Sequence, residues 1–239
     1  MLAALGLRYG TEEATEFSEQ VHKTVALNAY RSSIEMAKER GAFEVYDTER
    51  EKNNPFINRL READPEMYEE MKKYGRRNIA CLTIAPTGTT SLMTQTTSGI
   101  EPVFLSVAFG GVVSLCFHPS HELGVEHDIF FKGISGFVDE VDALVEKSPY
   151  YKATSNDVDW LMKVKMQGRI QKWVDHSISV TINLPNDVDE DLVNRLYVEA
   201  WKSNILGRVS TTVGGLHGGS SDFLSLLVEM STPEREPSR

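Results

Sequence analysis

The sequence has few cysteines and no long apolar run, and these two shortages exclude several classes of protein. Only 2 of its 239 residues are cysteines, Cys81 and Cys116, and they form neither a disulfide framework nor a Cys-x-x-Cys motif. Such sparse cysteine is typical of a reducing compartment, so we expect a cytoplasmic protein. The longest uncharged stretch, between Glu101 and Glu122, is broken by glycine and proline and is too short in apolar residues to span a bilayer. No membrane partner is therefore expected.

Basic residues are also in the minority. The chain has 25 lysines and arginines against 35 aspartates and glutamates, which gives a net charge of −10. Binding to nucleic acid relies on clustered lysine and arginine, so we expect no direct contact with nucleic acid. The 41% of hydrophobic and 25% of charged residues are the proportions of an ordinary globular protein, which leaves enough apolar side chains for a core.

Helical and extended patterns alternate along the chain. Apolar residues recur at helical spacing in some segments and at every second position in others. Helices are expected at 12–40, 65–74, 89–95, 156–174 and 189–203, and strands at 78–85 and 177–184. Residues 43–65 are expected to be irregular, because they are polar and contain the turn signal Asn53-Asn54-Pro55. Strands and helices in alternation predict an α/β fold.

A hydroxyl-rich turn after the first expected strand is the most informative segment. The apolar run at 81–85 predicts a strand covered on both faces, Pro86 ends it, and Gly88 lets the backbone bend without a Cβ clash. Free N–H groups at the following helix start, together with hydroxyls, suit an anion such as a phosphate. The candidate phosphate-binding residues are Pro86, Thr87, Gly88, Thr89, Thr90 and Ser91. The spacing alone also fits an ordinary threonine-rich N-cap, and the lysine of a Walker motif is missing.

Three ordered blocks of the sequence resemble the large subunit of ribonucleotide reductases. The blocks are 5–43, then Thr-Ile-Ala-Pro-Thr-Gly-Thr-Thr-Ser-Leu at 83–92 with 97–104, then 171–185 with 193–202. The residue sequence of the turn most resembles that of the adenosylcobalamin-dependent (class II) enzymes. The resemblance implies part of a ten-stranded α/β barrel, in which the candidate residues hold the phosphates of the substrate.

The resemblance also implies a reaction and its participants. Its enzymes reduce ribonucleoside diphosphates or triphosphates to deoxyribonucleotides for DNA synthesis, with adenosylcobalamin as cofactor and the ribonucleotide as small-molecule partner. A homodimer is the assembly suggested for the full-length enzyme. The radical cysteine of these enzymes lies in an Asn-x-Cys-x-Glu motif, which does not occur in this chain. No catalytic residue is therefore predicted, Cys81 is interpreted as a small buried apolar residue, and we expect a fragment that cannot reduce a nucleotide alone.

Two stretches depart from the family pattern. We expect residues 1–204 to be the C-terminal portion of the barrel, with 105–138 as an atypical insert or frame-disrupted stretch. Residues 205–239 are expected to be an atypical, partly disordered tail. A shifted reading frame or a recombined gene is our hypothesis for both stretches.

A histidine cluster offers an alternative function. His118, His121 and His127 lie within ten residues, a density of ligands that suits Zn²⁺, so a non-enzymatic metal-binding module is the alternative interpretation. Their spacing is not that of a metalloprotease helix, and Pro119 prevents a regular helix through the cluster. No metal ligand is predicted for the main interpretation.

Two further polar sites are interpreted as structural. The run Asp175-His176-Ser177 cannot form a catalytic triad through adjacency in sequence, because neighbouring side chains of a strand point to opposite faces. We expect a strand start with a local hydrogen bond there. Glu101 follows the hydroxyl-rich turn, and we expect it to order that turn rather than to act as a base.

Overall fold

The computed structural model describes residues 1–94, 96–103, 145–155, 157–184, 189–203, 209–213 and 225–228. Its helices are a short 3₁₀ helix η1 (Ala3–Leu5), α1 (Glu12–Arg40), α2 (Thr48–Glu51), α3 (Pro55–Ala63), α4 (Pro65–Tyr74), α5 (Gly88–Thr94), α8 (Trp160–Gln171) and α9 (Glu190–Lys202). Its strands are β1 (Val180–Leu184), β2 (Val209–Val213) and β3 (Ser225–Val228).

Helix α1 begins and ends where the local signals predict. The Thr11 hydroxyl accepts a hydrogen bond from the Ala14 N–H at 3.2 Å, which satisfies one of the free donors of the first turn. Gly41 follows the last turn with φ of +79°, a left-handed conformation that favours glycine. The predicted helix at 12–40 is confirmed.

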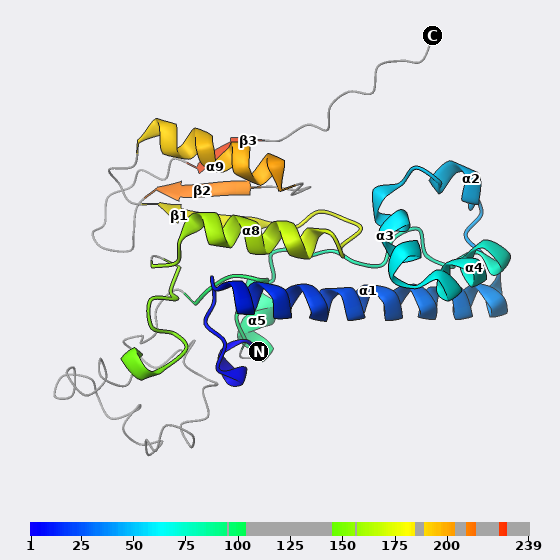
Figure 1. Cartoon of the computed structure of the whole chain (residues 1–239), viewed down its shortest axis with the longest axis horizontal. Helices are drawn as coiled ribbons and strands as arrows, with labels where there is room; N and C mark the ends of the chain where they lie inside the picture. The colour runs from blue at the N-terminus through cyan, green and yellow to red at the C-terminus, as the bar shows by residue number, and fades with distance from the viewer. Residues whose placement is uncertain are drawn as a thin grey trace, which may run out of the picture.

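The prediction of an irregular segment at 43–65 is wrong, because helices α2 and α3 lie within it. The Asn54 side chain accepts hydrogen bonds from the N–H groups of Phe56 and Ile57, and Pro55 is the first residue of α3. An Asn-Pro pair that signals a turn is equally suited to begin a helix. Figure 1 shows α2, α3 and α4 gathered at one end of α1. The buried residues of this cluster include Tyr30, Ile34, Phe56, Leu60, Met67 and Met71.

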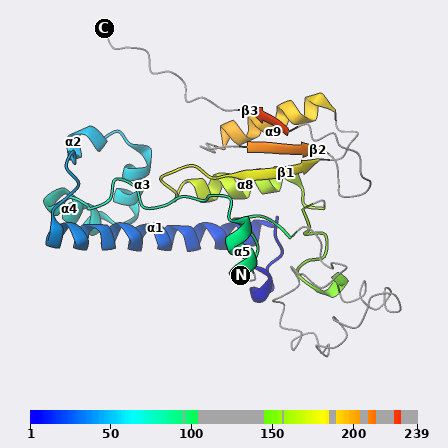
Figure 2. The same ribbon diagram turned by 180° about the vertical axis from the view of Figure 1, so that it is seen from behind.

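A three-stranded sheet forms the other part of the described structure. Strands β1 and β2 are parallel, with Val180 opposite Val209, and β3 pairs with β2 in the antiparallel sense. The predicted alternation at 177–184 is confirmed, since every second side chain there is buried: Ile178, Val180, Ile182 and Leu184. The side chains of β1 pack against Val164 of α8 and Leu196 of α9. In Figure 1 and Figure 2, α1 and α9 lie on opposite sides of α8.

The remaining predicted helices are confirmed with slightly different ends. Helix α4 occupies 65–74 with Gly75 after its last residue, and α5 starts one residue before the predicted 89–95. Helix α8 is shorter than the predicted 156–174 because Asp159 caps it, and Asp189 caps α9 in the same way. None of the helices in the described part of the chain is long and apolar enough to cross a membrane.

The predicted strand at 78–85 is not a regular strand. It forms a single parallel bridge, between Ile84 and Ile178. None of its residues is fully buried and Ala85 is exposed, so the expectation of a strand covered on both faces is wrong. The physical reason is that the side chain of Asp175, rather than backbone carbonyls, accepts the N–H groups of Cys81 and Leu82.

The two atypical stretches are described only in small part. Residues 105–138, with Cys116 and the three clustered histidines, lie outside the described residues. Within 205–239 the structure describes β2 and β3, and β2 continues the sheet beside β1. The predicted boundary between 204 and 205 stays a prediction.

Gly168 of α8 provides a test of this packing. A Cβ atom at residue 168 would lie 2.6 Å from the Cβ and 2.9 Å from the carbonyl oxygen of Ser203, at the end of α9. We expect Gly168→Ala to lower the free energy of unfolding by about 1–3 kcal/mol, the usual cost of overpacking. Thermal and urea unfolding measure it, with Lys165→Ala on the exposed face of α8 as control. An alanine variant as stable as the wild-type chain would contradict the close approach of α8 and α9.

Candidate functional site

The hydroxyl-rich turn and α5 form a loop whose two ends are joined by hydrogen bonds. Thr87 and Ser98, eleven residues apart, meet there: the Thr87 N–H donates to the Ser98 hydroxyl at 3.2 Å. The Gly99 N–H donates to the Thr87 hydroxyl at 3.1 Å. We call Thr87, Ser98 and Gly99 the neck of the loop. The neck fixes the start of α5 relative to the segment that leaves the loop.

The start of α5 presents unused hydrogen-bond donors. The first N–H group that bonds to a carbonyl is that of Ser91, which donates to Thr87 at 2.8 Å. The N–H groups of Gly88, Thr89 and Thr90 have no acceptor among the described residues, as is usual in a first helical turn. The hydroxyls of Thr89 and Thr90 are exposed and likewise make no hydrogen bond within the described part of the chain.

Two other predicted site residues, Thr87 and Ser91, use their hydroxyls within the loop. The Thr87 hydroxyl belongs to the neck, and the Ser91 hydroxyl donates to the Gly88 carbonyl at 2.7 Å. Gly88 does not have a positive φ, so the expectation that it allows a special bend is wrong. No atom lies within 4 Å of the position that its Cβ would occupy. Open space therefore lies beside the backbone of residue 88.

The entry segment, residues 81–84, is fixed by Asp175. One carboxylate oxygen accepts the Cys81 N–H at 2.7 Å and the other accepts the Leu82 N–H at 2.9 Å. The Tyr30 hydroxyl of α1 donates to the same carboxylate at 2.8 Å. Burial raises the pKa of Tyr30, and the negative charge of Asp175 adds to that effect. The local hydrogen bond expected at residue 175 is instead a set of contacts with two distant segments.

The exit segment, residues 99–103, is fixed by α8 and β1. The Glu101 carboxylate accepts the Thr181 N–H at 2.9 Å and pairs with Lys163, whose ammonium also donates to the Thr181 carbonyl. Lys163 is only 4% exposed, and its burial lowers the pKa of the ammonium against the opposing effect of Glu101. The Ile100 carbonyl accepts the Tyr9 hydroxyl and the Gln167 amide, both at 2.8 Å.

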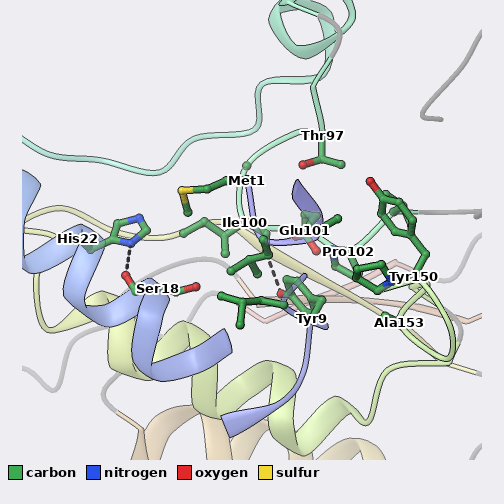
Figure 3. A pocket seen from close by; sticks show the side chains of 16 residues that line it. Met1, Tyr9, Ser18, His22, Thr97, Ile100, Glu101, Pro102, Tyr150 and Ala153 are labelled. Carbon is green, nitrogen blue, oxygen red and sulfur yellow. Dashed lines mark hydrogen bonds between the residues drawn. The ribbon is translucent and has the colours of Figure 1, made fainter. Parts of the chain in front are cut away.

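A cavity of about 170 Å³ lies beside the exit segment (Figure 3). Ile100, Glu101 and Tyr9 form part of its wall, and His22 lies at one side with its ring bonded to the Ser18 carbonyl at 2.8 Å. The candidate residues at 86–91 do not line this cavity. The cavity and the free N–H groups of α5 are therefore separate features.

Sequence reasoning missed most of the residues that support the loop. The sequence predicts only a local hydrogen bond at Asp175 and no role for Tyr9, Lys163 or Gln167. One signal was available: Lys163, Gln167 and Gln171 recur every four residues and are all buried in α8. Polar side chains on the buried face of a helix indicate partners elsewhere in the chain.

The described residues do not form a metal site. No group of three or more histidine, cysteine, aspartate or glutamate side chains in the described ranges is placed to hold a metal ion. His118, His121 and His127 lie outside these ranges, so the alternative of a metal-binding module has no support from the structure.

Known proteins resemble this chain over most of its length. A family model described as "Ribonucleotide reductase, barrel domain" matches residues 1–209. The chain is 29% identical over 229 residues to a vitamin B12-dependent ribonucleoside-diphosphate reductase of Mycobacterium tuberculosis (strain CDC 1551 / Oshkosh), covering 91% of this chain and 30% of that protein. It is also 29% identical over 210 residues to the protein of the same name from Thermoplasma acidophilum, covering 82% and 25%.

A solved structure resembles the chain as well. The alpha subunit of a class Id ribonucleotide reductase from Actinobacillus ureae matches with a TM-score of 0.59 and 20% identity, covering 85% of this chain and 35% of that one. At this identity the match supports the fold alone. The chain spans about a third or less of the length of the proteins it matches.

The environment of Cys81 gives a testable reactivity. Burial raises the pKa of its thiol, and the nearby Asp175 carboxylate raises it further. Less thiolate is then present at pH 8, so we expect Cys81 to react with iodoacetamide more slowly in the folded chain than in urea. Peptide mass spectrometry after timed alkylation measures both rates. Equal rates would contradict the described environment of Cys81.

Proposed function

We propose a function from one premise: this chain belongs to the ribonucleotide reductase barrel-domain family. The family match confirms the resemblance stated from the sequence, and the α/β fold is that of ribonucleotide reductases. We infer that the longer protein reduces ribonucleoside diphosphates or triphosphates to deoxyribonucleotides. This chain supplies the loop that binds the phosphates of the substrate.

The free donors at the start of α5 carry this proposal. The N–H groups of Gly88, Thr89 and Thr90 have no acceptor among the described residues, and two exposed hydroxyls lie beside them. Donors at a helix start attract an anion, and the open space at Gly88 leaves room for phosphate oxygens close to the backbone. Fixing the phosphates fixes the ribose, which is catalysis by positioning.

The described residues do not provide the radical chemistry. The Asn-x-Cys-x-Glu motif does not occur in this chain, and the thiol of Cys81 lies beside a carboxylate that disfavours its ionisation. The part of this chain in the reaction is therefore binding and orientation. In this proposal β1 and β2 are neighbouring strands of a ten-stranded barrel, and the entry segment runs beside them through the bridge between Ile84 and Ile178.

The names of the Mycobacterium and Thermoplasma relatives suggest adenosylcobalamin as the cofactor of the longer protein. Among the described residues, the cavity of about 170 Å³ beside Tyr9 is far too small for a corrinoid. This cavity is therefore not proposed as the cobalamin site, and in this proposal other parts of the longer protein take part in holding the cofactor. A homodimer of the full-length enzyme and a cytoplasmic location belong to the same proposal.

Titration of the purified chain with ADP tests the proposal. We expect saturable binding, and we expect both Gly88→Ala and the double variant Thr89→Ala, Thr90→Ala to weaken it by about tenfold or more, as for the loss of hydrogen bonds to a charged group. Gly88→Ala is the sharper change, because the added methyl meets no protein atom and alanine favours a helix. Gly88→Ala should weaken ADP binding without lowering the free energy of unfolding.

Circular dichroism of the same samples and an equivalent change elsewhere provide the controls. Thr24→Ala removes an exposed threonine hydroxyl from α1 that donates to the Gln20 carbonyl and to no residue of the loop, and it should leave ADP binding unchanged. A Gly88→Ala variant that binds ADP as tightly as the wild-type chain would contradict the phosphate site. A folded wild-type chain without ADP binding would show that this chain alone does not form it.

A further inference from the structure

We propose that Asp175 and Glu101 are positioning residues that fix the two ends of the phosphate loop against one unit, α8 with β1. The inference rests on the proposed phosphate-binding function and deepens it, because it assigns the residues that decide where the free N–H groups of α5 point. Neither carboxylate belongs to the loop itself, and each contacts backbone groups of a distant segment.

Asp175 anchors the entry segment. It lies between the end of α8 and the start of β1, and its two oxygens accept the N–H groups of two consecutive residues, Cys81 and Leu82. The His176 N–H then donates to the Leu82 carbonyl at 3.1 Å. Consecutive N–H groups bound by one carboxylate fix the direction of the backbone. Pro86 lies four residues after Leu82, and α5 starts at Gly88.

Glu101 anchors the exit segment because its carboxylate accepts a backbone N–H group of β1, as the carbonyl of a neighbouring strand would. Ile84 donates its N–H to the Ser177 carbonyl at 3.4 Å and accepts the Ser179 N–H at 2.9 Å, as in a parallel ladder. Thr181 is the next residue on the same edge, but the entry segment has turned away there. The Glu101 carboxylate accepts the Thr181 N–H instead, and Lys163 donates to the Thr181 carbonyl.

The two anchors act on one loop because the neck joins its ends. Thr87 follows the entry segment, Ser98 precedes the exit segment, Gly99 begins it, and hydrogen bonds connect Thr87 with both. Release of either anchor frees one side of the neck and changes the direction of the first turn of α5. The affinity of the loop for phosphate should then depend on carboxylates that phosphate never touches.

Amide hydrogen exchange and titration with pyrophosphate, both on the 239-residue chain, test this inference. We expect Asp175→Asn to speed exchange of the amides at 81–91 by tenfold or more and to weaken pyrophosphate binding by a similar factor. The asparagine amide would place donors opposite donors. Glu101→Gln should speed exchange at Thr181 and within 98–101 and weaken binding in the same way.

Tyr30→Phe is the matched control. It removes one hydrogen bond from the same Asp175 carboxylate but leaves both backbone contacts in place. We expect it to lower the melting temperature without changing exchange at 81–91 or pyrophosphate binding. A purely structural role of Asp175 would instead make both variants behave alike, which would overturn the inference.

The remaining outcomes separate this inference from the proposed function. Unchanged exchange around the loop in folded Asp175→Asn and Glu101→Gln variants would overturn the inference, as would faster exchange with unchanged binding. If Asp175→Asn does not fold, Glu101→Gln decides by the same criteria. A folded wild-type chain that does not bind pyrophosphate would contradict the proposed function, while the exchange rates would still show whether the carboxylates hold the loop.

Discussion

The Asp175 carboxylate makes the contact on which the arrangement of the chain depends. It bonds to the Tyr30 hydroxyl of α1 and to the backbone of Cys81 and Leu82, while its own backbone links α8 to β1. Three segments distant in sequence therefore meet at one charged group. An asparagine side chain could not accept all three donors, because its NH₂ group is a donor and its single oxygen has two lone pairs.

The elements that were predicted correctly are those specified by local signals. Thr11 and Gly41 delimit α1, and Asp189 caps α9, because capping uses groups only a few residues apart. The prediction of a strand in the entry segment was wrong because its N–H groups bond to the side chain of Asp175, 94 residues away from Cys81. The prediction of an irregular segment at 43–65 was wrong because one Asn-Pro pair fits both a turn and a helix start. Only packing against α1 decides between the two.

In the candidate site, too, local features could be predicted and contacts between distant residues could not. The hydroxyl-rich turn was visible from its composition, and the structure leaves donors free at Gly88, Thr89 and Thr90. The supporting groups were not visible, since Lys163 and Glu101 are 62 residues apart and their pairing is a product of the fold. The available hint was the set of buried polar side chains on α8, Lys163 among them, which indicates partners without identifying them.

A crystal structure of the chain with pyrophosphate would show whether the start of α5 binds phosphate, because it locates the anion instead of inferring it. We expect phosphate oxygens within hydrogen-bond distance of the N–H groups of Gly88, Thr89 and Thr90, with the entry segment still bonded to Asp175. Pyrophosphate bound elsewhere, or an ordered loop left empty at saturating pyrophosphate, would contradict it.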